Sequence, residues 1–235
     1  MIDIHTHILP QVDDGAIDID ESIEMIKMSI ESGVEKIILT PHYYGNGRNQ
    51  YSYGELLIRF EDFKSRVEEM LDIEIFLAQE IHYSRNIIEL FKSGDVNTIN
   101  NTNYLFTELP ICKEVDHEEY FYEISLMDKR IVLAHPERSL WLKVDDIKKI
   151  VCSGILVQLN AGSLLGEFGS KVKKRAQKLM KLKLVHFIAS DCHKVDKRIP
   201  NLHLAAKYVK KKHGEKVFNE LFKDNPGRLL LNDEI

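Results

Sequence analysis

Residues 1–15, MIDIHTHILPQVDDG, join a short apolar run to two closely spaced imidazole side chains. The run Met1–Ile4 has the length and composition of a buried β-strand. His5 and His7 follow it, and residues i and i+2 of an extended chain face the same side. Both rings can therefore reach a single ligand. The stretch predicts that the fold begins with a strand whose carboxyl end carries a binding site.

Further runs of strand length recur along the chain and alternate with helical patterns. Each run is mostly apolar on both faces, as in parallel strands that are covered on both sides. The later runs are Lys36–Thr40, Ile73–Ala78, Tyr104–Leu109, Ile131–Ala134, Ile155–Leu159 and Leu184–Ala189. Apolar stripes at helical spacing predict helices over 19–30, 56–71, 172–180 and 202–209, and weaker stripes predict helices over 120–127 and 147–151. Regular strand–helix alternation favours parallel strands joined by right-handed crossovers.

No linker or shift in composition divides the chain, so we expect residues 1–235 to form one α/β domain. The alternation favours a single distorted seven-stranded β/α barrel of the TIM-like type over an open sheet. A chain of this length can bury a substantial core. The sequence leaves the oligomeric state open.

The composition excludes several classes of protein. The net charge is −5, and nothing indicates the clustered basic surface of a nucleic-acid-binding protein. The short Lys-rich stretch 207–212 is typical of a solvated helix face. No apolar run approaches the roughly 18 residues of a membrane span, and the N-terminus lacks the pattern of a signal peptide. Cys112, Cys152 and Cys192 form no metal-spaced pair, which favours a reducing cytoplasmic setting.

Polar side chains collect where the predicted strands end. They are His5, His7, His42, Glu80, Glu108, His135, Asn160, Asp191 and His193, with Arg138 three residues after His135. The carboxyl ends of barrel strands meet on one face, so these side chains are expected to converge. Carboxylates gathered in one place raise each other's pKa and destabilise the fold, and divalent cations remove that cost. A mixture of imidazole and carboxylate donors suits Mn, Fe or Zn, and the sequence therefore predicts a multinuclear metal site.

Other polar residues are less informative. Asp13 and Asp14 precede Gly15 and are equally typical of a turn. The remaining histidines have no comparable position and are interpreted as structural or surface residues; they are His82, His117, His186, His203 and His213.

The stretch CHKVDKR, from Cys192 to Arg198, has the C-x5-R spacing of cysteine-dependent tyrosine phosphatases. Such a loop surrounds an anion with backbone N–H groups. Here Asp191 and Asp196 would repel a phosphate and raise the pKa of the thiol. We therefore interpret the spacing as coincidental.

These motifs resemble the PHP (polymerase and histidinol phosphatase) family, whose barrels bind up to three divalent metals. The resemblance extends over nearly the whole chain and is greatest to bacterial tyrosine-protein phosphatases found with capsular and exopolysaccharide synthesis. It rests on MIDIHTHILPQVDDG, the glutamates in AQEI and FTEL, and the motifs AHPER, IASDCH and DNPGRLL.

The resemblance implies three metal positions, the first two of which share Glu80. Their implied ligands are His5, His7, Glu80 and Asp191; Glu80, Glu108 and His135; and Asp14, His42 and His193. Many members of the family carry His where this chain has Asp14 and Glu108, a difference that favours the tyrosine phosphatase branch. Arg138 and Arg198 match positions that would bind the substrate phosphate, although Arg138 could instead pair with Glu137.

The expected chemistry is hydrolysis of phosphotyrosine by a metal-activated hydroxide, with Mn²⁺ as the leading cation. The implied substrate is the tyrosine-rich tail of a polysaccharide-synthesis autokinase. The segment Tyr43–Gly54 could flank an aromatic phosphoester or be an ordinary exposed loop. Two alternatives remain, a small-molecule phosphatase such as histidinol-phosphate phosphatase and a non-catalytic metal-binding interaction module.

Overall fold

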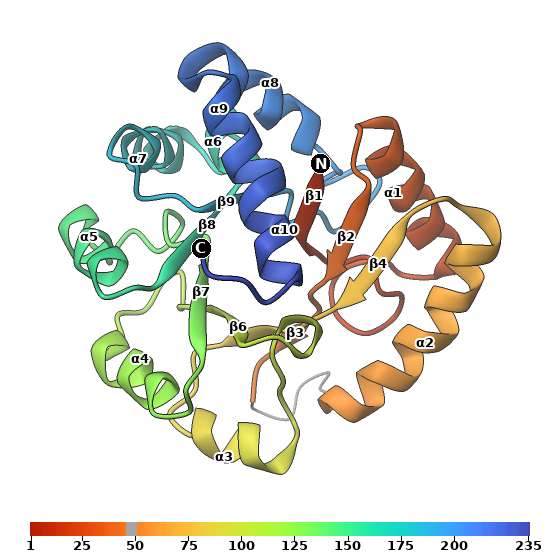
Figure 1. The fold of residues 1–235 in the computed structure, drawn as a ribbon, viewed down its shortest axis with the longest axis horizontal. Coiled ribbons are helices and arrows are strands. Elements are labelled where there is room, and N and C mark those ends of the chain that lie inside the picture. The colour runs from red at the N-terminus through yellow and green to blue at the C-terminus, as the bar shows by residue number, and fades with distance from the viewer. Residues whose placement is uncertain (46–50) are drawn as a thin grey trace.

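The computed structural model describes residues 1–45 and 51–235, in which helices surround a central group of strands (Figure 1). The strands are β1 (Ile2–Thr6), β2 (Lys36–Leu39), β3 (His42–Tyr43), β4 (Glu74–Leu77), β5 (Glu80–His82), β6 (Tyr104–Glu108), β7 (Arg130–Ala134), β8 (Leu156–Asn160) and β9 (Phe187–Ala189). They form two parallel sheets, with the orders β1-β2-β4 and β3-β5-β6-β7-β8-β9. The prediction of a parallel α/β fold is confirmed.

The closed seven-stranded barrel is not confirmed. Each predicted run contains a strand, but β3 and β5 are separate short strands that follow β2 and β4 along the chain. The interruption after β2 includes Pro41, which has no N–H for a ladder. The two sheets approach each other where Thr6 forms an isolated bridge with Cys192, and across the described residues they do not close into a barrel.

Most of the helices pack around the outside of the strands, whereas the segment that ends in α10 lies across their centre (Figure 1). They are α1 (Ile19–Glu31), α2 (Tyr53–Met70), α3 (Ile87–Ser93), α4 (His117–Ser125), α5 (Val144–Cys152), α6 (Ala161–Leu165), α7 (Ser170–Lys181), α8 (Leu202–His213), α9 (Glu215–Asn219) and α10 (Asn225–Leu230), with a 3-10 turn at Ile99–Asn101 and a π-helical turn at Glu220–Asp224. Side chains cap the first two helices. Asp18 accepts from the Glu21 N–H at the start of α1, and Ser52 and Glu55 form a capping box at the start of α2.

The alternating side chains of the strands supply two hydrophobic cores. One lies between the strands and the helices and includes Ile37, Leu105 and Leu133. The other lies among the strands themselves and includes Ile4 and Phe106, with Leu229 of α10 packed against them. The inner core therefore underlies the strand ends that carry the polar side chains.

The pairing of β1 with β2 shifts register between Asp3 and Thr6. Such bulges re-aim side chains and are frequent beside active sites. The His5 ring lies within this irregularity and packs edge-on against Phe106, with ring centroids 4.8 Å apart. The irregularity allows His5 to lie directly above the inner core.

None of the helices in the described part combines the length and apolar character needed to cross a bilayer. Residues 46–50, which belong to the predicted substrate-flanking segment Tyr43–Gly54, lie outside the described residues.

Candidate metal centre

The strand ends bring together eight of the nine side chains proposed as metal ligands, and Asp14 joins them from the loop between β1 and α1. The nine are His5, His7, Asp14, His42, Glu80, Glu108, His135, Asp191 and His193, and all but Asp14 and His42 are buried. Four combinations of these residues each have donor atoms within 4.8 Å of one another. The convergence expected from strand order is therefore observed.

His5 and His7 lie at the centre of the cluster. Their Nε2 atoms are 3.1 Å apart. His5 Nδ1 lies 3.2 Å from Gln158 Oε1, and His7 Nδ1 lies 2.6 Å from Asp13 Oδ2. Oxygen acceptors at both Nδ1 atoms favour the tautomer in which Nδ1 carries the proton and Nε2 presents a lone pair. Two such lone pairs directed at one point are the arrangement that metal-binding histidines adopt.

Glu80 and Asp191 complete this central group. Glu80 Oε2 lies 3.2 Å from His5 Nε2 and 3.4 Å from His7 Nε2, and Asp191 Oδ1 lies 3.3 and 3.4 Å from the same atoms. Both oxygens are buried and have no hydrogen-bond partner. Burial alone would raise the pKa of each carboxyl, but the neighbouring imidazoles, His5 foremost, hold both pKa values well below the usual range. Carboxylate oxygens without hydrogen-bond partners beside two imidazole nitrogens fit a site for a cation.

A second group surrounds Glu80. His135 Nε2 lies 2.6 Å from Glu80 Oε1 and 3.7 Å from Glu108 Oε2. His42 Nδ1 lies 2.9 Å from Glu80 Oε2 and 3.7 Å from Glu108 Oε1. The Glu80 carboxylate therefore faces the central group with one oxygen and His135 with the other, as a bridging ligand would.

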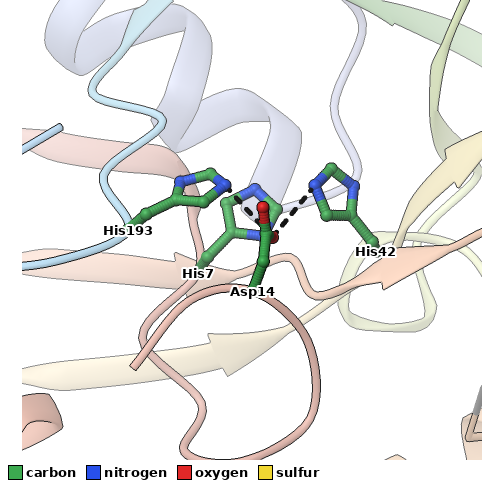
Figure 2. Close-up of side chains that lie close together, drawn as sticks. All are labelled: His7, Asp14, His42 and His193. Carbon is green, nitrogen blue, oxygen red and sulfur yellow. Dashed lines mark ion pairs between the residues drawn. The ribbon is translucent and has the colours of Figure 1, made fainter. Parts of the chain in front are cut away.

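An outer group is formed by His7, Asp14, His42 and His193 (Figure 2). Asp14 Oδ1 lies 3.4 Å from His193 Nε2 and 3.5 Å from His42 Nε2. The His193 contact is the largest of the effects that lower the pKa of Asp14. Asp14 is the most exposed member, with 65% of its side chain accessible, so this group lies nearest to solvent.

The donor chemistry fits divalent cations. Every donor in the four combinations is a nitrogen or an oxygen, and none is a thiolate. Such mixed sets suit Mn, Fe or Zn rather than a sulfur-ligated structural ion. The geometry also favours a cation, because two buried carboxylate oxygens lack hydrogen-bond partners and the Nε2 atoms of His5 and His7 face each other.

Two arginines lie beside the cluster. Arg138 Nη1 is 3.1 Å and Arg198 Nη2 is 2.5 Å from Asp191 Oδ2, the oxygen that faces away from His5 and His7. Both arginines line a pocket of about 380 Å³, together with Tyr44, Ile111 and several candidate ligands. An anion entering this pocket would meet two guanidinium groups. The salt bridge between Arg138 and Glu137 that the sequence allowed is absent from the ion pairs of the described residues.

The backbone is strained at three of these residues. His135, Asp191 and Arg198 have φ angles of +30°, +54° and +54°. Side chains other than glycine rarely adopt such conformations, and these outliers concentrate at functional sites.

The structure adds residues that the sequence analysis did not select. Asp13, considered only as a turn residue, lies behind His7, and its Oδ2 also accepts from the His42 N–H. His82, which the sequence analysis interpreted as a structural or surface residue, lies beside the site: its Nδ1 lies 3.1 Å from Glu108 Oε1 and its side chain lines the pocket. His82 could have been found by the i, i+2 rule, which links Glu80 to His82 as it links His5 to His7. Asp13 lies in a turn, to which that rule does not apply.

The other four histidines lie outside the cluster. His117 and His213 pack against aromatic rings, His186 accepts from the Val157 N–H, and His203 contacts Ser32. A larger hollow of about 550 Å³ between α4 and α5 contains none of the candidate ligands. The chemistry is therefore concentrated at the strand ends.

Cys192 is unsuited to nucleophilic attack. It is fully buried, and burial, with a smaller effect from Asp3, raises the pKa of its thiol to about 12. A cysteine phosphatase needs an accessible thiolate. The geometry supports the interpretation of the C-x5-R spacing as coincidental.

A parallel α/β fold with clustered imidazole and carboxylate donors beside two arginines defines a candidate metal-dependent protein that binds an anion. Residues 1–231 match the family described as "Capsular polysaccharide synthesis, CpsB/CapC". The chain belongs to this family.

Relatives extend over most of the chain. CapC of Staphylococcus aureus is 35% identical over 203 residues, which are 84% of this chain and 79% of CapC. The tyrosine-protein phosphatase YwqE of Bacillus subtilis strain 168 is 32% identical and is matched over 100% of this chain and 93% of its own. One solved structure comes from work on YwqE of B. subtilis and CpsB of Streptococcus pneumoniae, which are described as unique metal-dependent tyrosine phosphatases. It matches this chain with a TM-score of 0.93 at 31% identity, and the match covers 100% of this chain and 96% of that one. These matches confirm the resemblance to capsule-associated tyrosine phosphatases.

Proposed function

We propose that this protein is a metal-dependent protein tyrosine phosphatase that hydrolyses phosphotyrosine. The observation that carries the proposal is the convergence of the unpartnered Glu80 Oε2 and Asp191 Oδ1 with the Nε2 atoms of His5 and His7, beside two arginines in one pocket. The names of its relatives and the structural match support the same activity.

The proposed metal ligands form three sets. They are His5, His7, Glu80 and Asp191; Glu80, Glu108 and His135; and Asp14, His42 and His193. The short distances within each set support this division. His7 also lies with the outer set, and His42 with Glu80 and Glu108, so neighbouring sets share an edge. The nitrogen and oxygen donors favour Mn²⁺, with Fe or Zn as substitutes.

Divalent ions held there would lower the pKa of water, so that hydroxide is available near neutral pH. Arg138 and Arg198 would exchange their contact with Asp191 Oδ2 for the phosphate oxygens and balance the charge on them. Arginine suits this role because its planar fork donates two parallel hydrogen bonds and keeps its charge. A phenolate with a pKa of about 10 leaves more easily than an alkoxide, so a dedicated general acid is dispensable.

The pocket favours an aromatic phosphoester. Tyr44, Pro110 and Ile111 line it together with the two arginines and the candidate carboxylates. Its volume of about 380 Å³ suits one side chain rather than a folded domain. Burial, with the nearby carboxylates, raises the pKa of Tyr44, so its hydroxyl stays protonated and can donate a hydrogen bond.

We assign the substrate to the tyrosine-rich tail of a polysaccharide-synthesis autokinase, because the family is described by capsular polysaccharide synthesis. The three free cysteines support a reducing cytoplasmic location. We also propose that residues 1–235 act as one PHP-type β/α phosphatase domain.

The test is turnover of a phosphotyrosine peptide by the purified protein. We expect hydrolysis that EDTA abolishes and added Mn²⁺ restores. Asp191→Asn should remove turnover and lower the metal content, whereas Asp196→Asn, five residues further along the same loop, should leave both unchanged.

Two comparisons exclude the alternatives. Faster turnover of histidinol phosphate than of the phosphotyrosine peptide would identify a small-molecule phosphatase. Protein that holds its metal yet fails to hydrolyse p-nitrophenyl phosphate would be a binding module, and the proposed activity would then be rejected.

A further inference from the structure

Phe168 lies against both arginines of the pocket. It belongs to the short segment between α6 and α7, and its side chain is half-buried. The Cζ atom of Arg138 lies over its ring, 4.4 Å from the centroid, and the Cζ atom of Arg198 lies over the same ring at 5.9 Å. Both distances are within the range in which an aromatic face attracts a guanidinium group. One side chain therefore contacts two cations that arrive from different loops.

The arginines have little else to fix them. Each makes an ion pair with Asp191 Oδ2, and Arg198 Nη1 also lies 2.8 Å from His193 Nε2. The Nε atom of Arg198 is buried and has no hydrogen-bond partner. When phosphate draws the guanidinium groups from Asp191, the Phe168 ring remains as a support for both.

The fold holds the Phe168 segment firmly. Gly166 and Gly169 flank it with φ angles of +101° and +89°, which favour glycine. A Cβ at Gly162 would lie 3.1 Å from Phe168 Cε2, so the ring packs closely on the start of α6. Asn201 Nδ2 donates to Glu167 Oε1 over 2.7 Å and ties the segment to the loop that carries Arg198.

We propose that Phe168 is a positioning residue that holds Arg138 and Arg198 at the spacing needed to bind the substrate phosphate. Phe168 is absent from the described lining of the pocket, so it acts through the arginines and not by touching the substrate. The inference rests on the proposed function for its catalytic consequence. Its binding consequence can be measured with inorganic phosphate alone.

The experiment compares Phe168→Leu with Phe168→Tyr in the metal-loaded protein. Leucine keeps an apolar side chain and removes the aromatic face, whereas tyrosine keeps the face. For Phe168→Leu we expect a rise of about 3- to 30-fold in the KM for a phosphotyrosine peptide and in the inhibition constant of inorganic phosphate. Phe168→Tyr should stay within about twofold of the wild type, with unchanged metal content and melting temperature in both variants.

A double-mutant cycle with Arg138→Lys separates positioning from general packing. If Phe168 acts through Arg138, the effect of Phe168→Leu should shrink in the Arg138→Lys background. Equal losses in the leucine and tyrosine variants, or a loss accompanied by reduced metal content or melting temperature, would overturn the proposal.

Failure of the proposed function gives a different result. If the wild type does not hydrolyse phosphotyrosine, calorimetric titration with inorganic phosphate still compares the variants. Weaker phosphate binding in Phe168→Leu alone would then support the positioning role, and equal binding in all three proteins would refute it.

Discussion

Replacing Asp13 by asparagine is expected to weaken metal binding while the protein stays folded. Asp13 Oδ2 lies 2.6 Å from His7 Nδ1 and 3.0 Å from the His42 N–H nitrogen, and Oδ1 accepts from the Gly15 N–H. Asparagine has the same shape but offers one oxygen and one NH₂ group. If the NH₂ group faces His7, two donors oppose each other, and the ring must move its proton to Nε2. If it faces Gly15, the turn loses its hydrogen bond instead.

The size of the effect follows from the role of a carboxylate behind a metal-binding histidine. Removal of such a partner typically lowers metal affinity by about 10- to 100-fold, or about 1.4–2.7 kcal/mol. The lower part of that range applies if the amide oxygen keeps its contact with His7. The upper part applies if the His7 proton moves to Nε2, because the lone pair that faces His5 is then lost.

The assay is a titration of metal-depleted protein with Mn²⁺, in which binding is measured by calorimetry and activity by turnover of p-nitrophenyl phosphate. At saturating Mn²⁺, Asp13→Asn should recover most of the wild-type rate. Asp18→Asn is the matched control, because Asp18 caps α1 outside the site and asparagine caps a helix about as well. Unchanged Mn²⁺ affinity in Asp13→Asn would refute the orienting role of this carboxylate.

Three further substitutions test other parts of the site. Cys192→Ala should keep most of the activity in steady-state assays, because the buried thiol, with a pKa of about 12, is not a thiolate at pH 8. A variant that holds its full metal content and is inactive would contradict this. Arg138→Lys should lower kcat/KM for a phosphotyrosine peptide by about 10- to 100-fold through lost charged hydrogen bonds, whereas the same change at exposed Arg66 should have no effect. Gly15→Ala should lower the free energy of unfolding, measured by urea denaturation, by about 1–3 kcal/mol, because a Cβ at this position collides with the His7 carbonyl. Gly54→Ala in α2 is the control: its Cβ meets open space, and the substitution should not destabilise the protein.

Local periodicity and strand order were sufficient to predict much of the molecule. Each predicted strand run contains a strand, and the rule that parallel strands end on one face predicted the convergence of eight of the nine candidate ligands. The ninth, Asp14, was indicated only by the family resemblance. The division into nine strands could not be predicted, because β3 and β5 are very short and follow β2 and β4 after gaps of only two residues. Whether the sheets close into a barrel depends on pairing between distant segments, and the spacing of residues in a single sequence does not predict that pairing.

The supporting residues of the site were harder to predict than the candidate ligands. Asp13 and Asp14 are adjacent and chemically identical, yet one carboxylate is buried behind His7 and the other is 65% exposed in the outer group. Only the path of the turn at Gly15 separates them. Phe168 likewise carries no signal in the sequence, because its role depends on two arginines that are 30 residues before and after it.

The positive φ angles of His135, Asp191 and Arg198 link the candidate site to the stability of the fold. Conformations of this type cost on the order of 1–3 kcal/mol each, a considerable part of the stability of an ordinary domain. Glycine at any of the three positions would remove this conformational cost and raise the free energy of unfolding, but it would also remove a side chain from the candidate metal centre. If the three side chains serve the proposed site, substitutions to glycine would raise the stability of the fold and remove function at the same time.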